Sequence, residues 1–269
     1  MSKAIPVLLY HSVSAQPSPA LAKYTLSPRR FEEHACVIAE QGWRALTIDA
    51  LTDAIADETV DEVPTLAITF DDGFADTAEE AAPILAGFGL PATLYVTTGA
   101  VGGTARWLGR DCARQIASWQ QLADMATSGW EIGAHSIDHP ELDVLAPQGR
   151  RSQIEGSRRS LQDRLGLPID SFAYPHGYHG EAVRADVVAA GYRTACAVKN
   201  TLSSAADDAF ARARLTIPSD TTGDDLARLL SDARDRNVAP AAGGGVHTAV
   251  WRFYRRARHQ LSARVGEGR

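Results

Sequence analysis

Two adjacent carboxylates are the residues of this sequence that are best placed for chemistry. Asp71 and Asp72 follow the apolar run AITF at 67–70 and stand before Gly73. Neighbouring side chains at the end of a strand point in different directions, so one aspartate can bind a cation while the other handles a proton. The alternative interpretation is structural, with Asp71 capping a helix and Asp72 belonging to a turn.

Two histidines four residues apart form the second pattern. His135 and His139 lie in the segment HSIDHP at 135–140, directly after a predicted strand. Side chains at positions i and i+4 share one face of a helical turn, so both imidazoles can bind one ion and Asp72 can complete a three-ligand site. Such a site leaves positions open for water.

The two motifs together, TFDDG at 69–73 and HSIDHP at 135–140, resemble those of the polysaccharide deacetylase family, also called the NodB-homology or carbohydrate esterase family 4 group. The segment FAYPHG at 172–177 stands in the place of the family's third motif, and the resemblance covers residues 5–218. It implies a distorted (β/α) barrel and metal-dependent removal of acetyl groups from an N-acetylated sugar.

The resemblance also implies a role for each matching residue. Asp72, His135 and His139 would hold one divalent metal ion, usually zinc in this family, and Asp71 would act as the general base. A bound cation polarises the acetamide carbonyl and acidifies a water molecule, while the base removes a proton as that water attacks. The metal and a backbone N–H, such as that of His176, would stabilise the oxyanion.

The sequence departs from the family pattern in the third motif. Ala173 stands where the family usually carries an arginine that orients the base. Arg214, in a predicted strand at 214–217, is the candidate substitute because a strand end across the barrel can reach the same carboxylate; the alternative is a solvated arginine. We also expect Tyr174, Pro175 and Arg214 to contribute to substrate binding.

The fifth motif departs as well, because residues 215–220 lack the histidine that normally protonates the leaving amine. The candidates for this catalytic acid are His11, His176 and His179, of which His11 and His176 are favoured; the alternative is that they bind substrate or pack. The sequence also has no equivalent of the Asp and Trp of the fourth motif. Sugar stacking or core packing is expected of Tyr10, Trp107, Tyr174 and Tyr178.

Apolar runs that alternate with helical patterns predict the architecture. The predicted strands lie at 5–10, 65–70, 92–97, 131–134, 171–174 and 194–198, and the predicted helices at 29–41, 77–87, 118–128 and 147–165. This alternation, without a linker before residue 235, favours one closed or nearly closed βα barrel over two separate domains. We therefore expect a single α/β domain at 1–238.

The composition is that of a soluble chain with a substantial core. Of 269 residues, 45% are hydrophobic and 22% charged, which excludes disordered and collagen-like classes. The net charge of −6 offers no footprint for nucleic acid, and three widely separated cysteines indicate neither a disulfide framework nor a thiolate metal cluster. The apolar stretch at 5–10 is too short for a signal peptide, so we expect a cytoplasmic protein.

The C-terminal segment differs from the rest. Residues 239–246 have the Gly/Ala/Pro composition of a flexible linker, and residues 247–269 carry six arginines against one acidic residue, with aromatic residues between them. This pattern predicts a basic amphipathic helix. Such a helix can lie on an anionic membrane surface, which would place the domain at the inner membrane face, or it can contact the barrel or a partner.

Three functions are compatible with these residues. The first is N-deacetylation of an amino sugar or glycan intermediate. The second keeps the fold and the metal but hydrolyses another amide bond in a small molecule, as allantoinase-like and imidase-like enzymes do. The third is a non-catalytic carbohydrate-binding domain that has lost its acid. Substrate profiling separates the first two, and replacing Asp71 with Asn tests the third.

Overall fold

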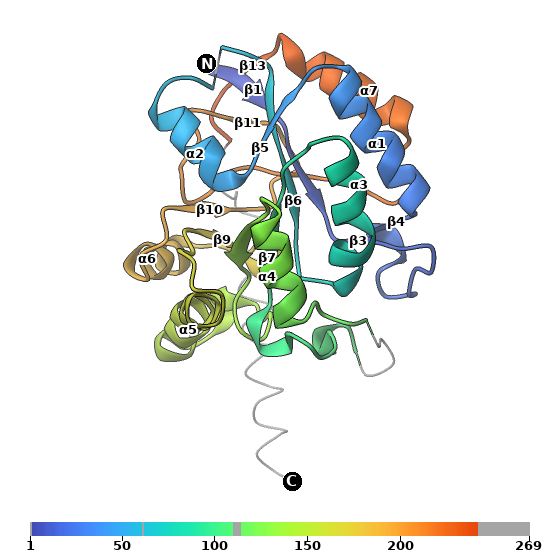
Figure 1. The fold of residues 1–269 in the computed structure, drawn as a ribbon. Helices are drawn as coiled ribbons and strands as arrows, with labels where there is room; N and C mark the ends of the chain where they lie inside the picture. Colours follow the sequence, from blue (N-terminus) through green and yellow to red (C-terminus); the bar gives the residue numbers. More distant parts are fainter. Residues whose placement is uncertain (1, 61, 110–113, 242–269) are drawn as a thin grey trace.

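A curled sheet of eight parallel strands forms the centre of the molecule (Figure 1). The computed structural model describes residues 2–60, 62–109 and 114–241. The order along the sheet is β10 (Thr194–Cys196), β9 (Ser171–Ala173), β8 (Glu131–Ala134), β7 (Thr93–Val96), β6 (Thr65–Phe70), β2 (Val7–Tyr10) and β12 (Leu215–Thr216), with β5 (Arg44–Leu46) beside the start of β6. Cys196 also bridges Arg212, just before β12, so the curl brings the two sheet edges together.

Helices pack around the outside of this sheet. They are α1 (Pro28–Glu40), α2 (Ile48–Ala56), α3 (Ala82–Gly87), α4 (Trp119–Thr127), α5 (Pro147–Leu165), α6 (Glu181–Ala189) and α7 (Gly223–Arg234). Ser27, Ser118 and Thr222 cap α1, α4 and α7 by accepting backbone N–H groups that have no partner within the helix. The alternation of parallel strands and helices confirms the predicted distorted (β/α) barrel.

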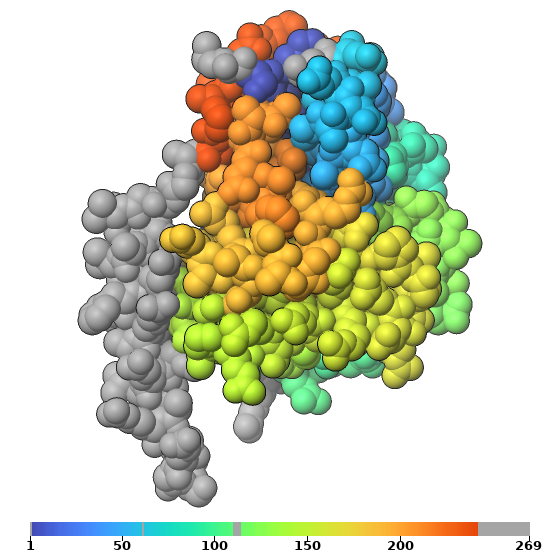
Figure 2. Space-filling model, turned by 90° about the vertical axis from the view of Figure 1, so that its left-hand side faces the viewer, coloured from blue at the N-terminus to red at the C-terminus, as the bar shows by residue number. Residues whose placement is uncertain are grey.

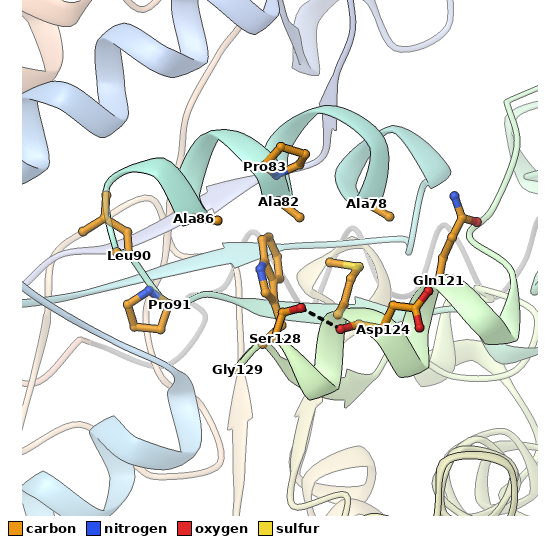
Figure 3. Close-up of a pocket in the computed structure, with 13 residues that line it drawn as sticks. Ala78, Ala82, Pro83, Ala86, Leu90, Pro91, Gln121, Asp124, Ser128 and Gly129 are labelled. Carbon is orange, nitrogen blue, oxygen red and sulfur yellow. Dashed lines mark hydrogen bonds between the residues drawn. The ribbon is translucent and has the colours of Figure 1, made fainter.

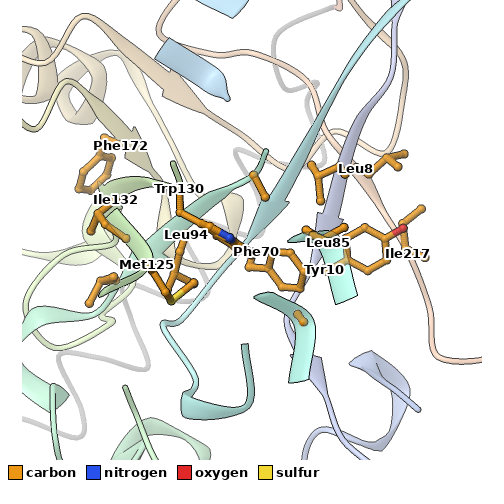
Figure 4. Close-up of a cluster of buried hydrophobic side chains, with 14 of the residues drawn as sticks. Leu8, Tyr10, Phe70, Leu85, Leu94, Met125, Trp130, Ile132, Phe172 and Ile217 are labelled. Carbon is orange, nitrogen blue, oxygen red and sulfur yellow. The ribbon is translucent and has the colours of Figure 1, made fainter. Parts of the chain in front are cut away.

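Hydrophobic side chains fill both sides of the sheet. The outer cluster lies between strands and helices and includes Tyr10, Phe70 and Trp130 (Figure 4). The inner cluster fills the barrel and includes Ala67 and Tyr95. Successive residues of a strand point to opposite faces, so β6 contributes to both clusters. Because burial of each large apolar side chain contributes about 1.5–3 kcal/mol, this packing holds β6, and the residues that follow it, firmly in place.

The predicted strand at 5–10 is two strands in the structure. β1 (Ser2–Ile5) is antiparallel to β11 (Ser203–Ser204) and β13 (Asn237–Val238), whereas β2 belongs to the central sheet. Pro6 separates them because it has no N–H to donate to a ladder, although its carbonyl oxygen accepts a hydrogen bond from Ala67 N. A short parallel pair, β3 (Ser12–Val13) and β4 (Thr25–Leu26), follows β2.

The helix predictions also need correction. The segment predicted as a helix at 77–87 begins with a wide π-turn, η2 (Thr77–Ala81), and α3 begins only at Ala82. Pro83, in the first turn of α3, cannot donate a backbone hydrogen bond, which fits the irregular turn before it. The periodicity analysis missed α2, α6 and α7, of which the first two have only nine residues each.

Helices and the segments between them form the outer surface. Figure 2 shows the side on which α2 (cyan) and α5 and α6 (yellow-green to yellow) flank the orange residues that follow α6. A pocket of about 610 Å³ lies between α3 and α4, over Met125 and Trp130 (Figure 3), and none of the predicted site residues lines it. Within the described ranges, no helix is both long and apolar enough to cross a bilayer.

The chain is tied to the barrel as far as residue 241. Ala241 N donates to Asp207 Oδ1 over 2.9 Å, and Lys199 Nζ donates to Ala241 O over 3.1 Å. The predicted basic helix at 247–269 and most of the predicted linker at 239–246 lie outside the described residues, as does Cys112. The two described cysteines, Cys36 and Cys196, are free thiols.

Candidate metal centre and catalytic site

A cavity of about 410 Å³ lies at the carboxyl ends of the strands. This end of a βα barrel carries the loops in which functional residues gather. Six of the nine predicted site residues line the cavity, namely His11, Asp71, Asp72, His135, His139 and His176. Residues far apart in the sequence therefore meet around one space.

The turn after β6 sends its two carboxylates to different partners. Asp72 and Gly73 have φ angles of 76° and 84°, left-handed conformations that turn the chain sharply after the strand. A Cβ on Gly73 would lie 3.3 Å from atoms of β7, so glycine fits both the turn and the close approach. As a result Asp71 meets Arg214 inside the barrel, whereas Asp72 meets His139.

The two histidines lie in a compact loop, and the predicted helical turn is wrong. Ser136 and His139 have φ angles of 66° and 59°, and Pro140 follows directly, a residue that disfavours helical conformation in its predecessor. Gln153 Oε1 accepts two backbone N–H groups of this loop. The loop still brings the two imidazoles together, with 4.9 Å between the ring centroids of His135 and His139.

Three ligand atoms converge at the floor of the cavity. Asp72, His135 and His139 are buried and place one ligand atom each within 4.8 Å of the others. His139 Nε2 lies 3.1 Å and His135 Nε2 lies 3.6 Å from Asp72 Oδ1. Within the described chain, Asp72 Oδ1 and His135 Nε2 have no hydrogen-bond partner. Such atoms are costly to bury, and a divalent cation would satisfy them, so these residues fit a metal site.

The surroundings of His135 suit a metal ligand. Its Nδ1 lies 2.8 Å from Ala173 O, and donation to this carbonyl leaves the lone pair of Nε2 facing Asp72. Burial lowers the pKa of His135 to about 4, so the ring is neutral at pH 7. Burial acts to raise the pKa of Asp72, but the nearby His139 outweighs it and holds this pKa below its usual value.

Arg214 forms a two-point ion pair with Asp71. Its Nη1 donates to Oδ1 over 2.6 Å and its Nη2 to Oδ2 over 2.8 Å, while the guanidinium lies over the ring of Tyr95. Burial acts to raise the pKa of Asp71, but Arg214 outweighs it and holds this pKa below its usual value. Arg214 thus reaches the predicted carboxylate. Its side chain is fully buried, so the prediction that it contacts substrate is wrong.

The two favoured candidates for the catalytic acid differ in exposure. His11 is half-buried and packs against Tyr24, with 5.0 Å between ring centroids. Its buried Nδ1 has no hydrogen-bond partner in the part of the chain that the structure describes. His176 is exposed, has a φ of 57°, and meets the ring of His139 edge-on at 4.5 Å.

Three residues considered for contact with sugar belong to the core, and for Tyr10 and Tyr174 core packing was the alternative expectation. Tyr174 is fully buried, and its hydroxyl donates to a backbone carbonyl over 2.8 Å. Tyr10 is buried in the same outer cluster, and Pro175 is buried beside Tyr174. The tyrosines occupy strand positions or strand ends that face the helices rather than the barrel mouth. Trp107 and Tyr178, by contrast, do line the cavity.

Sequence reasoning missed three lining residues that can form side-chain hydrogen bonds, Tyr24, Asn200 and Thr216. Tyr24 lies just before β4, and the other two lie at or near the end of the sheet where the cavity opens. Their positions near strand ends were the only available signal. His179, the third candidate acid, stacks on Tyr174 at 5.0 Å and is not among the residues that line the cavity.

Sequence comparison connects this site to known proteins. The sequence profile of the polysaccharide deacetylase family matches residues 59–195. The chain is also 26% identical over 189 residues to YxkH of Bacillus subtilis, whose name assigns it provisionally to the polysaccharide deacetylases. That match covers 70% of this chain and 62% of YxkH, so the chain spans less than two thirds of that relative's length.

Solved structures share the fold at low sequence identity. The deacetylase PplD of Streptococcus pyogenes, solved in complex with acetate, gives a TM-score of 0.75 at 21% identity, covering 86% of this chain and 99% of that chain. BC0361, a polysaccharide deacetylase from Bacillus cereus, gives 0.72 at 21% identity, covering 85% and 69%. These likenesses confirm the fold class expected from the motifs.

Proposed function

Because this chain belongs to the polysaccharide deacetylase family, we propose that it is a metal-dependent hydrolase that removes N-acetyl groups from an N-acetylated amino sugar or glycan intermediate. One observation carries the proposal. Three buried ligand atoms meet beside a separate buried carboxylate, that of Asp71, at the floor of an open cavity. Hydrolysis of an amide needs both a means of polarising the carbonyl and a base, and this arrangement can provide the two.

We assign the metal to Asp72, His135 and His139, with zinc as the proposed ion. Two imidazoles and one carboxylate form a donor set that suits zinc and leaves a further position open. Bound there, the ion supplies positive charge that polarises the acetamide carbonyl and makes a water molecule more acidic. The contact between His135 Nδ1 and Ala173 O holds one ligand in the tautomer that binding needs.

Asp71 is the proposed general base. Its Oδ2 lies 3.9 Å from His135 Nε2, close to the ligand atoms although it belongs to the neighbouring turn position. The ion pair with Arg214 keeps the carboxylate ionised and fixes both of its oxygens. Asp71 can therefore accept a proton from the water that attacks the acetyl carbon. Cleavage of the C–N bond then yields acetate and a free amine.

We propose His11 as the acid that protonates the leaving amine. Its ring lines the cavity, and its charge is close enough to lower the pKa of both Asp71 and Asp72. Contact with Tyr24 restricts the orientation of the ring within the cavity. His176, exposed beside His139, is assigned to contact with the substrate.

Acetate release from defined substrates tests this proposal. Protein reconstituted with zinc should release acetate from at least one N-acetylglucosamine compound among free oligomers, nucleotide-linked forms and lipid-linked forms. Asp72→Ala should abolish the release, and Asp71→Asn should lower it by about 10²–10⁴-fold. Asp138→Asn is the matched control, because this exposed side chain lies in the same loop as the two histidines. Release that survives Asp72→Ala would overturn the metal assignment.

The other functions compatible with the sequence are outcomes of the same experiment. If zinc binds through Asp72, His135 and His139 but no acetate is released, the small-molecule amide hydrolase becomes the leading interpretation. A panel of cyclic and linear amides then distinguishes that enzyme from a non-catalytic carbohydrate-binding domain.

A further inference from the structure

The two ligand histidines are oriented in different ways. His135 Nδ1 lies 2.8 Å from Ala173 O, whereas the buried Nδ1 of His139 has no hydrogen-bond partner among residues 2–60, 62–109 and 114–241. The backbone N–H of His139 donates to Ser136 Oγ over 3.1 Å, but that bond does not fix the ring. A histidine that binds metal usually has its second nitrogen hydrogen-bonded, so a different contact must orient His139.

Trp107 provides such a contact by stacking on the ring of His139. The ring centroids are 4.9 Å apart and the planes differ by 19°. Stacked aromatic rings at this distance attract one another beyond the area they bury. A flat indole against one face limits the tilt of the imidazole while Nε2 stays 3.1 Å from Asp72 Oδ1. His176 meets the same imidazole from another side, at 72°.

The loop that carries Trp107 is fixed to the turn that carries Asp72. Trp107 lies in a short 3₁₀ turn, η4 (Arg106–Leu108), between β7 and α4. Further along the loop, Ala117 N donates to Gly73 O over 2.9 Å, and Ile116 bridges Phe74. Trp107 also packs on a separate hydrophobic cluster formed by Leu21, Phe74, Ala105 and Ile116. The indole is therefore held in place relative to the proposed metal ligands.

We propose that Trp107 is a positioning residue for the metal ligand His139. The inference rests on the metal site of the proposed function, and it gives Trp107 a role in metal affinity instead of sugar stacking. His139 has a φ of 59°, a conformation that is unfavourable for a residue with a side chain, so contacts that stabilise it matter for binding. The buried Nε1 of Trp107 has no hydrogen-bond partner within the described ranges, so the indole acts through its face.

Zinc affinity of Trp107 variants tests this role. Trp107→Leu removes the aromatic face, Trp107→Phe keeps a smaller one, and competition with a chromogenic chelator gives the dissociation constants. We expect Trp107→Leu to weaken zinc binding by about tenfold, the lower end of the range for losing a group that orients a metal ligand, and Trp107→Phe to weaken it less. Trp119→Leu is the matched control, because Trp119 begins α4, packs beside Arg164 of α5 and should not affect zinc.

A second readout follows Trp107 itself. Zinc binding to the wild type should change the tryptophan emission, and Trp107→Phe should lose that change whereas Trp119→Leu keeps it. This readout remains decisive even if Trp107→Leu does not fold. A change in emission on zinc binding that is the same in Trp107→Phe and in the wild type would overturn the proposal.

Kinetics at saturating zinc separate positioning from sugar stacking. A sugar platform predicts that Trp107→Leu raises KM and leaves zinc affinity unchanged, and that result would also reject the proposal. Failure of the wild type to bind zinc would reject the metal site and the role of Trp107 together. Zinc binding by the wild type with an unaltered affinity in Trp107→Leu would reject only the role of Trp107.

Discussion

One carboxylate lies at each end of the central sheet, Asp71 at the carboxyl end and Glu131 at the amino end. The two carboxylates differ in the kind of group that contacts them. At the carboxyl end, both oxygens of Asp71 pair with the guanidinium of Arg214. At the amino end, Glu131 begins β8 and accepts hydrogen bonds from two hydroxyl groups and from Asp49 N. None of the ion pairs among the described residues involves Glu131. One carboxylate thus has a cation, and the other has only neutral donors.

This difference shifts the pKa values of the two carboxyl groups in opposite directions. Burial raises the pKa of both groups, but the charge of Arg214 outweighs it at Asp71, whereas the hydrogen bonds do not outweigh it at Glu131. Burial and then the charge of Glu131 also raise the pKa of Asp49, to about 7. The carboxyl group whose pKa is held low is therefore the one at the cavity, where the proposed general base is needed.

Replacing the carboxylate at each end of the sheet should give the largest difference between the two ends, and that difference is in kcat. Asp71→Asn removes the proposed general base, a group that contributes about 10²–10⁴-fold in rate, so kcat for acetate release should fall by about that factor. Glu131→Gln, at the far end of the sheet, should leave kcat unaffected. Steady-state assays of both variants at saturating zinc make the comparison. Equal losses would show that the ends are not functionally distinct.

Loss of the cation should give the largest change in stability. Arg214→Met leaves Asp71 buried without its partner, and breaking a buried pair in this way typically costs about 3–5 kcal/mol. Urea unfolding at pH 7 should show that loss in the free energy of unfolding. The double variant Asp71→Asn/Arg214→Met should recover much of it, because neither partner then leaves an unpaired charge. No recovery would mean that Arg214 stabilises the barrel through contacts other than Asp71.

Residue types predicted which side chains meet at the cavity better than they predicted the local backbone geometry. Asp72, His135 and His139 could be chosen from the sequence because they follow strands that end at one face of the barrel. Their spacing did not reveal the backbone conformation. A compact loop with left-handed residues brings two side chains four positions apart together, as a helical turn does. Pro140, directly after His139, was the available signal against a helix.

Contacts that are remote in the sequence account for the other differences. Arg214 is 143 residues from Asp71, and only the barrel topology made the pair predictable. Tyr10 and Tyr174 could not be assigned to the core from sequence, because strands buried on both faces carry no alternating polar residues to mark which side faces the helices. Trp107 depends on a loop between β7 and α4 whose path no local pattern specifies.

The stability of the protein should depend on pH through Asp49, at the amino end of the sheet. This is the smallest of the expected effects. Because the fold raises the pKa of Asp49 from 3.8 to about 7, the folded state keeps a proton that the unfolded state releases between these values. Stability should therefore fall as the pH rises through this range. Asp49→Asn removes the titration and should be more stable than the wild type near pH 8, with little difference near pH 4.

The first turn of α2 limits that gain, because a negative charge at Asp49 interacts favourably with the helix N-terminus and the substitution removes it. Urea unfolding of both proteins at the two pH values measures the difference. Glu131→Gln should act in the same direction, since it removes the charge that opposes ionisation of Asp49. A stability difference that is the same at both pH values would show that Asp49 ionises normally, and the contrast between the two ends would then depend on Glu131 alone.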